Sequence, residues 1–218
     1  MRINRRDRWG NAKKRKEFLL IAVVDYGAGN VASVVRALRH LGGDAQLVSD
    51  PSELLAAERI VFPGQGHFGQ AMRQLEATGL GRALRQGIDS GRPFLGICLG
   101  LQLLYQGSDE APGVPGLGLL PGHCQRFAPG LPVPHVGWQQ VRAPFRSKRT
   151  GLENYDDFYY FVHSYYAPAD GVAVTAVADY GLRFAAAVRR DQLCAVQFHP
   201  EKSGRAGLDY LAAWLQIR

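Results

Sequence analysis

The stretch from Pro93 to Leu104 constrains the fold more than any other part of the chain. An apolar run ends in Gly96 to Gly100 (Gly-Ile-Cys-Leu-Gly), and a second apolar run follows at once. This order is typical of a buried strand that turns sharply into a helix, as in a nucleophile elbow with cysteine in place of serine. Glycine suits both flanks, because so tight a turn crowds any Cβ beside the nucleophile. We therefore expect Cys98 at a strand end, beside a helix start that favours a thiolate.

A second stretch contains the groups that a cysteine nucleophile needs. The apolar segment 193–198 is typical of a buried strand that ends at His199, because Pro200 has no N–H to continue the ladder. Glu201 follows closely enough to accept a hydrogen bond from the imidazole. A thiolate needs a nearby base, and that base needs an orienting acid. Taken singly, the first stretch is explained by a core cysteine and the second by a capping histidine. The presence of both stretches in one chain favours a catalytic triad of Cys98, His199 and Glu201.

A third stretch, Pro63 to Gly66 (Pro-Gly-Gln-Gly), follows the predicted strand 59–62. Strand ends are where an open α/β sheet collects its ligand groups. A glycine-rich loop also exposes backbone N–H groups, as an oxyanion hole requires. An ordinary strand-to-helix turn is the alternative interpretation.

Strands and helices alternate in the first half of the chain. Apolar runs typical of buried strands occupy 18–24, 45–48, 59–62 and 93–98. Apolar residues at helical spacing predict one helix over 31–41 and one or two helices over 67–90. This alternation argues for a parallel α/β sheet.

The second half of the chain differs from the first in composition and in predicted secondary structure. Gly and Pro are frequent from about residue 108 to Pro134, and β-like segments follow at 158–162, 173–178, 184–188 and 193–198. Few helices separate these segments, so we expect added antiparallel strands. A final helix carries the apolar stripe Leu208, Leu211, Trp214 and Leu215. No repeat or linker divides the chain, and we expect one domain over 18–218.

The excess of basic residues lies at the N-terminal end of the chain. Residues 1–17 hold eight of the 26 Lys and Arg but two of the 19 Asp and Glu, so the remainder is nearly neutral despite a net charge of +7. A basic arm can bind nucleic acid or an anionic membrane, but its low apolar content favours a disordered leader. We therefore expect neither as a partner.

The cysteines and the apolar runs point to an intracellular protein. Cys98, Cys124 and Cys194 are widely spaced and odd in number, which argues against a disulfide framework or a zinc site and fits a reducing cytoplasm. The longest early apolar run, 18–24, is too short to span a membrane.

These motifs resemble the class I glutamine amidotransferases. Within that family, four stretches are similar to the glutaminase subunits of imidazole glycerol phosphate synthases, which serve histidine biosynthesis. They are Asp25-Tyr26-Gly27-Ala28-Gly29-Asn30, Pro63-Gly64-Gln65-Gly66-His67-Phe68, Tyr160-Phe161-Val162-His163-Ser164-Tyr165-Tyr166 and His199-Pro200-Glu201-Lys202-Ser203. The resemblance runs from about residue 19 to the C-terminus. It implies a flavodoxin-like α/β fold, with a mostly parallel central sheet flanked by helices.

The resemblance also implies a mechanism that uses neither a cofactor nor a metal. Cys98 attacks the side-chain amide carbon of glutamine, His199 moves the protons, and Glu201 holds the imidazole. The oxyanion is held by the backbone N–H of Leu99 and one from the loop Gly64, Gln65 and Gly66. The amino-acid end of glutamine is recognised by Gln102, Glu110, His163, Ser164 and Tyr165. In that set the carboxylate of Glu110 matches the substrate ammonium.

A partner is implied as well, because the ammonia must reach an acceptor. The family passes it to a (β/α)₈-barrel cyclase subunit, in a heterodimer that forms imidazole glycerol phosphate and aminoimidazole carboxamide ribotide. Lys202 and the segment 134–138, which includes Trp138, are the candidate docking residues. Two positions depart from the family pattern. Gln65 stands where an apolar residue is common, and Gln139 stands where Asn is common.

Other functions stay open at this point. One is a related glutaminase that feeds a different acceptor; others are a non-catalytic module of the same fold and a hydrolase of γ-glutamyl peptides. A dinucleotide-binding protein is the rival of a different class, because Gly27 to Ala32 fits G-x-G-x-x-G/A after a strand and Asp50 lies about 20 residues on. That rival leaves Cys98 and His199 unexplained.

Overall fold

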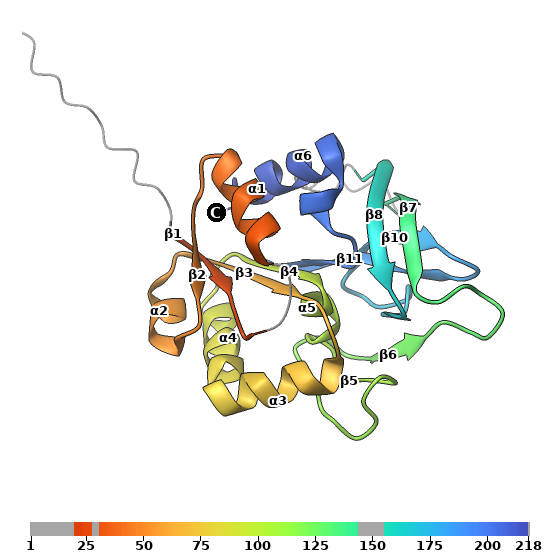
Figure 1. Ribbon diagram of the computed structural model, residues 1–218, viewed down its shortest axis with the longest axis horizontal. Coiled ribbons are helices and arrows are strands. Elements are labelled where there is room, and N and C mark those ends of the chain that lie inside the picture. Colours follow the sequence, from red (N-terminus) through yellow and green to blue (C-terminus); the bar gives the residue numbers. More distant parts are fainter. Residues whose placement is uncertain (1–19, 28–30, 144–154, 218) are drawn as a thin grey trace, which may run out of the picture.

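A central sheet of seven strands organises the computed structural model, which describes residues 20–27, 31–143 and 155–217 (Figure 1). The strand order is β10-β11-β12-β4-β3-β1-β2. The strands are β1 (Leu20–Val24), β2 (Asp44–Val48), β3 (Arg59–Gly64), β4 (Phe94–Cys98), β10 (Val174–Asp179), β11 (Arg183–Arg190) and β12 (Leu193–Val196). Strands β2, β1, β3, β4 and β12 are parallel, whereas β11 pairs in antiparallel fashion with both β12 and β10. The predicted mostly parallel α/β fold, with added antiparallel strands, is confirmed.

Helices cover both faces of this sheet. In Figure 1, α1 (Val31–His40) and α6 (Gly204–Trp214) lie over one face, and α2 (Pro51–Ala56), α3 (Phe68–Thr78) and α4 (Leu80–Asp89) lie over the other. Side chains of β1 alternate between the two resulting cores: Ile21 and Val23 pack on the α1 and α6 side, and Ala22 and Val24 on the opposite side. This two-residue period is that of a strand buried on both faces. No helix in the described ranges is long and apolar enough to cross a membrane.

Smaller sheets lie beside the carboxyl ends of β3 and β4. Strands β7 (His135–Val141) and β8 (Asp157–His163) form an antiparallel pair, and β6 (His123–Arg126) pairs with β5 (Gly107–Ser108) and β9 (Tyr165–Tyr166). The chain thereby brings residues 160–166 next to the end of β4, although they lie more than 60 positions later in the sequence.

The predicted strand-to-helix turn at Cys98 is present, but the helix is short. Helix α5 spans only Leu99–Gln102. The carbonyls of Leu103, Leu104 and Tyr105 accept hydrogen bonds from N–H groups in the segment 117–120 instead of continuing a helix. The apolar run therefore continues as buried irregular chain, which local periodicity does not distinguish from a helix.

Helix α2 was absent from the sequence-based prediction, although its signals are present. Asp50 is its N-cap, and its carboxylate accepts hydrogen bonds from the backbone N–H groups of Ser52 and Glu53, while Pro51 occupies the first turn. This capping role accounts for Asp50 without a bound ribose. Residues 28–30, part of the rival dinucleotide fingerprint, and the predicted leader 1–17 lie outside the described residues.

Two glycines let neighbouring chain segments approach the turn at Cys98. A Cβ on Gly96 would lie 2.9 Å from the carbonyl oxygen of Gly100 and 3.0 Å from the Cβ of Ala195. A Cβ on Gly100 would overlap the carbonyl oxygen of Phe62 in β3. The turn is therefore packed against both neighbouring strands, as the Gly-x-Cys-x-Gly pattern predicts.

We predict that Gly100→Ala lowers the free energy of unfolding by about 1–3 kcal/mol, because β3 must move to admit the methyl group. The matched control is Gly81→Ala in α4, where the nearest atom to the added Cβ is 3.5 Å away. Alanine there should be neutral, or stabilising by up to about 1 kcal/mol. Urea unfolding measures both, and equal effects would contradict this account of the packing.

Candidate active site

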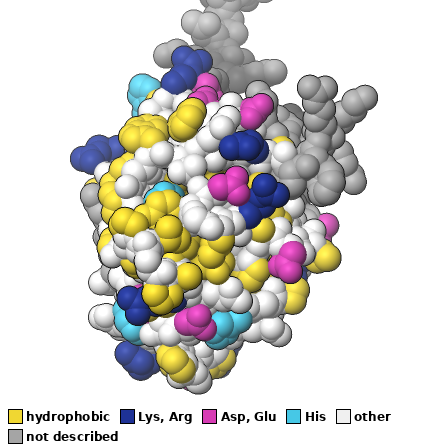
Figure 2. Space-filling view, turned by 90° about the vertical axis from the view of Figure 1, so that its right-hand side faces the viewer, with side chains coloured by type: hydrophobic (Ala, Val, Ile, Leu, Met, Phe, Trp, Pro, Cys, Tyr) yellow, Lys and Arg dark blue, Asp and Glu magenta, His cyan; other side chains and the backbone are white. Residues whose placement is uncertain are grey.

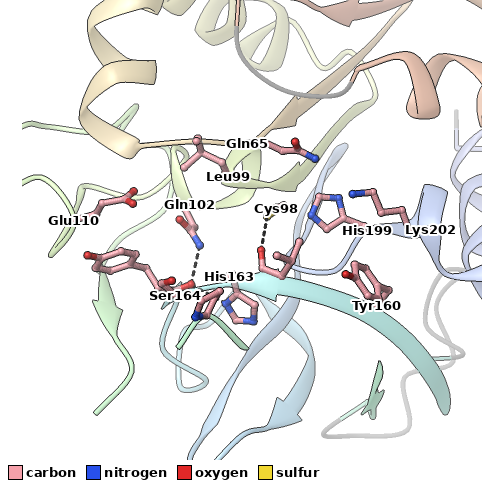
Figure 3. A pocket seen from close by; sticks show the side chains of 14 residues that line it. Gln65, Cys98, Leu99, Gln102, Glu110, Tyr160, His163, Ser164, His199 and Lys202 are labelled. Carbon is pink, nitrogen blue, oxygen red and sulfur yellow. Dashed lines mark hydrogen bonds between the residues drawn. The ribbon is translucent and has the colours of Figure 1, made fainter. Parts of the chain in front are cut away.

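A cavity of about 360 Å³ opens at the carboxyl ends of β3 and β4, where α/β sheets bind ligands (Figure 3). Most of the predicted site residues line it. They are Gln65, Gly66, Cys98, Leu99, Gln102, Glu110, His163, Ser164, Tyr165, His199 and Lys202, joined by Pro134, Tyr160 and Val162. Three predicted residues are not on its wall: Gly64 and Glu201 lie behind it, and Trp138 lies on the outside of β7.

Cys98 occupies a strained backbone conformation at the end of β4. Its φ is 55° and its ψ is −110°, in a region that residues with a side chain rarely adopt. The side chain is nearly buried, at 6% exposure. Its Sγ lies 3.8 Å from the carbonyl oxygen of Val162 and 3.6 Å from Nε2 of Gln197. The strained turn thus presents a single sulfur atom to the cavity.

His199 and Glu201 form a buried pair beside this sulfur. Nδ1 of His199 lies 2.8 Å from Oε1 of Glu201, and each side chain is 2% exposed. Since the carboxylate only accepts, Nδ1–H is the donor and Nε2 is the nitrogen available to the cavity. Figure 3 shows the imidazole next to Cys98. The pair has the arrangement of a base and its orienting acid.

The charge environment favours a protonated His199. Burial lowers the pKa of His199, but the negative charge of Cys98 and the contact with Glu201 outweigh it and raise that pKa to about 10. An imidazolium beside Cys98 stabilises a thiolate, which is the nucleophilic form of cysteine. The geometry therefore suits a thiolate–imidazolium pair at neutral pH.

The loop after β3 lies directly across from the sulfur. Gly64 is the register partner of Cys98, and a Cβ there would lie 2.8 Å from both the Cβ of Leu99 and the backbone nitrogen of Gly100. Gly66 has a φ of 99°, which glycine adopts without strain. Leu99 begins α5, and the first N–H groups of a helix have no partner within it. Leu99 and the Gln65–Gly66 turn thus face one cavity from two sides.

Glu110 lies at the end of the cavity opposite His199 (Figure 3). Its Oε2 accepts a hydrogen bond of 2.7 Å from the backbone N–H of Phe68, at the start of α3. The carboxylate is thus held by a helix N-terminus, an arrangement that stabilises negative charge. Sequence analysis assigned Glu110 to substrate recognition; the structure adds this capping contact, which fixes where the carboxylate points.

Gln102 is committed to contacts within the protein. Its side chain is 4% exposed, and its Nε2 donates to the carbonyl oxygen of Tyr165 at 2.7 Å and to Oε1 of Gln197 at 3.0 Å. Gln197 was not singled out from the sequence. Its position two residues before His199, pointing the same way along an extended chain, is the signal that could have identified it.

His163 is also engaged on both sides of its ring. Nδ1 lies 2.8 Å from the carbonyl oxygen of Tyr165, and Nε2 lies 3.1 Å from Nδ1 of His135. His135 in turn stacks on Tyr180, with ring centroids 4.0 Å apart. Burial lowers the pKa of His135 to about 4 and, as the largest effect, that of His163 to about 3. Both imidazoles are therefore neutral near pH 7, and neither nitrogen of His163 is left for a ligand.

The predicted docking residues form a cluster at the mouth of the cavity. The Nζ of Lys202 lies 6.0 Å from the ring centroid of Tyr160, within reach of a cation–π contact. The rings of Trp138 and Tyr160 meet edge-on, with centroids 6.2 Å apart. Tyr160 lines the cavity, so this cluster connects its wall to the outer surface. Within the described part of the chain, no three His, Cys, Asp or Glu side chains are grouped to hold a metal ion.

Comparison with protein families agrees with this geometry. The model of the class-I glutamine amidotransferases matches residues 22–216, nearly the whole described chain. The chain belongs to the class-I glutamine amidotransferase family. It is therefore an enzyme that acts on the amide of glutamine.

Individual relatives narrow the comparison. The chain is 50% identical over 199 residues to the imidazole glycerol phosphate synthase subunit HisH of Methanothermobacter thermautotrophicus, covering 91% of this chain and 98% of that one. It is 45% identical over 205 residues to the chloroplastic imidazole glycerol phosphate synthase hisHF of Arabidopsis thaliana, covering 90% of this chain but 34% of that one. A crystal structure of a glutamine amidotransferase superposes with a TM-score of 0.69 at 22% identity, covering 88% of this chain and 98% of that chain, and shows the shared fold.

We predict that the buried histidine pair makes the fold sensitive to acid. Between pH 6.5 and about 4, histidines of the unfolded chain bind protons that native His135 and His163 do not, so the unfolding free energy falls as pH falls. Each group contributes up to about 1.4 kcal/mol per pH unit. His135→Phe should reduce this slope in urea unfolding measured across the window. His40→Phe, at an exposed position of α1, is the control, and an equal reduction of the slope in this variant would contradict the assignment.

Proposed function

We propose that this chain is the glutaminase subunit of an imidazole glycerol phosphate synthase, in histidine biosynthesis. The observation that carries the proposal is the strained Cys98 beside the buried His199 and Glu201 pair. The match to synthase subunits over nine-tenths of the chain supports the choice of pathway. In this account the chain hydrolyses glutamine to glutamate and ammonia.

In the first half of the reaction, the Cys98 thiolate attacks the side-chain amide carbon of glutamine. The new C–S bond displaces the carbonyl π electrons onto oxygen, and the resulting oxyanion accepts hydrogen bonds from the N–H of Leu99 and from the Gln65–Gly66 turn. Imidazolium His199 donates its Nε2 proton to the amide nitrogen. The C–N bond then breaks, ammonia leaves, and a γ-glutamyl thioester remains on Cys98.

In the second half, neutral His199 accepts a proton from water through Nε2, and the hydroxide attacks the thioester carbon. The C–S bond breaks and its electrons return to sulfur, which restores the thiolate–imidazolium pair. The carboxylic acid of the glutamate product ionises in water. Glu201 stays hydrogen-bonded to Nδ1 throughout, so it keeps the imidazole oriented and stabilises its charged form.

The positions of the charged groups in the cavity suit glutamine. The Glu110 carboxylate lies at the end opposite Cys98 and His199, so it is placed to meet the α-ammonium group while the side-chain amide reaches the sulfur (Figure 3). Ser164 and Tyr165 line the same cavity and supply polar contacts for the α-carboxylate. Gln102 and His163 line the same cavity, and both hold the Tyr165 carbonyl in place.

One face of the β7–β8 pair is suited to a partner. Val136, Trp138 and Phe158 alternate onto this face and are 56%, 54% and 53% exposed, which is unusual for large apolar side chains. Their face also carries Tyr160 and Val162, which line the cavity. Figure 2, viewing the side on which Figure 1 places β7 and β8, shows hydrophobic side chains gathered at its centre.

We infer that a (β/α)₈-barrel cyclase subunit docks on this face and receives the ammonia. Burial of the apolar face would supply affinity, and its continuity with the cavity would keep ammonia out of water. Lys202 at the rim is placed for an acidic residue of the partner. The hisHF relative supports the pairing, because this chain accounts for only 34% of that longer protein.

We predict that Cys98→Ala abolishes glutamine hydrolysis, since it removes the sulfur that lies beside His199 and lines the cavity. Synthesis by the cyclase partner with added ammonia should continue, because that step does not use the sulfur. The matched control is Cys194→Ala, a buried cysteine in β12, which should retain hydrolysis. Glutamate release and ammonia-dependent synthesis are measured separately. Hydrolysis at the wild-type rate in Cys98→Ala would refute the mechanism.

We predict that Trp138→Ala weakens binding of the cyclase subunit at least tenfold, as loss of a central aromatic anchor does. The control is Leu47→Ala, a large apolar side chain that is 49% exposed on β2 at the other edge of the sheet. Calorimetric titration of each variant with the cyclase gives the affinities. Equal effects of the two substitutions would place the partner elsewhere.

A further inference from the structure

We propose that Gln197 is a further catalytic residue of the glutaminase reaction. Its side-chain N–H binds the Cys98 sulfur and stabilises the thiolate, both before attack and when the sulfur leaves the thioester. The proposal rests on the proposed function, because it concerns the same nucleophile. Six contacts among residues from different parts of the chain carry it.

The first contact joins Gln197 to the reacting atom. Nε2 of Gln197 lies 3.6 Å from Sγ of Cys98 and donates a hydrogen bond to this large acceptor atom. The Gln197 side chain is completely buried. A buried donor that meets a charged acceptor makes a stronger hydrogen bond than a neutral pair does. This donor therefore stabilises the thiolate in preference to the thiol.

The other close neighbour of the sulfur has the opposite preference. The carbonyl oxygen of Val162, 3.8 Å from Sγ, can accept a hydrogen bond from the thiol but repels a thiolate. His199 balances the thiolate by charge, yet in the reaction it gives its proton to the leaving nitrogen. Gln197 keeps its proton at every step. It is thus the neutral donor that remains on the sulfur while His199 changes protonation state.

The orientation of the Gln197 amide follows from the groups behind it. The backbone carbonyl of Tyr165 can only accept, so Gln102 must present Nε2 to it at 2.7 Å. The second N–H of the same Nε2 then meets Oε1 of Gln197 at 3.0 Å. Because the oxygen of Gln197 is held there, its Nε2 must point toward Cys98. A backbone carbonyl thus determines which end of a distant amide faces the nucleophile.

The same carbonyl is fixed by a second chain of contacts. Nδ1 of His163 must also donate to Tyr165, at 2.8 Å, and this leaves Nε2 to accept from His135 at 3.1 Å. Both imidazoles are held neutral by burial, so this arrangement persists at neutral pH. We assign Gln102, His163 and His135 as positioning residues, because they act on the sulfur only through Gln197.

The test uses Gln197→Met and Gln197→Glu in the full-length chain bound to the cyclase partner. Methionine keeps the length but removes the donor; glutamate keeps the shape and the acceptor for Gln102 but replaces the donor with negative charge. We expect kcat for glutamine hydrolysis to fall about tenfold to a hundredfold in Gln197→Met, the range of a hydrogen bond to a charged group, and further in Gln197→Glu. KM should change little, because Gln197 does not line the cavity.

Alkylation of Cys98 by iodoacetamide distinguishes catalysis from packing. Both variants should need higher pH for rapid alkylation, because the thiolate has lost its donor, whereas a packing defect alone leaves the pH profile in place. Gln86→Met, at an exposed position of α4, is the control and should match wild type. Wild-type kcat with an unshifted alkylation profile in both variants would overturn the proposal.

Two further measurements keep the outcomes separable. Calorimetric titration of each variant with the cyclase does not depend on the chemistry at Cys98, so a wild-type affinity shows that the variant is folded and docked. Glutamine-dependent synthesis by the wild type tests the proposed function independently of Gln197. If neither variant folds, NMR of the wild-type protein replaces the measurements on the variants, and the side-chain amide resonances of Gln197 are followed across pH. These should shift as the Cys98 thiolate is protonated, and constant resonances would overturn the proposal.

Discussion

The backbone of Cys98 is the constraint on which the rest of the site depends. A backbone φ of 55° at a residue other than glycine costs of order 1–3 kcal/mol of conformational energy. Such a conformation persists only where the surrounding structure holds it in place. Here Gly96 and Gly100 let β3 and β12 pack against the turn so closely that the chain has no room to relax. The fold therefore holds the sulfur at one point, and the other groups need only to converge on that point.

Those other groups come from segments that are distant in sequence. His199 and Glu201 follow β12, which is adjacent to β4 in the sheet, and the Gln65–Gly66 turn follows β3 on its other side. The order of strands, with β12 inserted next to β4, is what unites them. Buried polar side chains complete the site, and two acceptor-only groups fix the orientation of three of them: the Tyr165 carbonyl orients Gln102 and His163, and the Glu201 carboxylate orients His199.

Sequence analysis recovered the sheet and the residues at its strand ends, because both have local signals. Strand β4 and the strand before His199 are short apolar runs followed by glycine or proline, and their chemistry lies at the boundary. The length of α5 could not be predicted, because it depends on hydrogen bonds between residues 103–105 and 117–120. Gln197 was overlooked for a similar reason: its neighbours Gln102 and Cys98 are about 95 and 99 positions away. Local sequence patterns predict the secondary structure of one segment, whereas polar networks depend on which segments the fold brings together.

The central claim is that Cys98 carries the glutamyl group during hydrolysis. The most direct measurement is acid quenching of the wild-type complex during turnover of glutamine, followed by mass spectrometry of its peptides. The account predicts a glutamyl adduct on the peptide that contains Cys98, removed by hydroxylamine as a thioester is. An adduct on another residue, or none under conditions where glutamate is released rapidly, would contradict it.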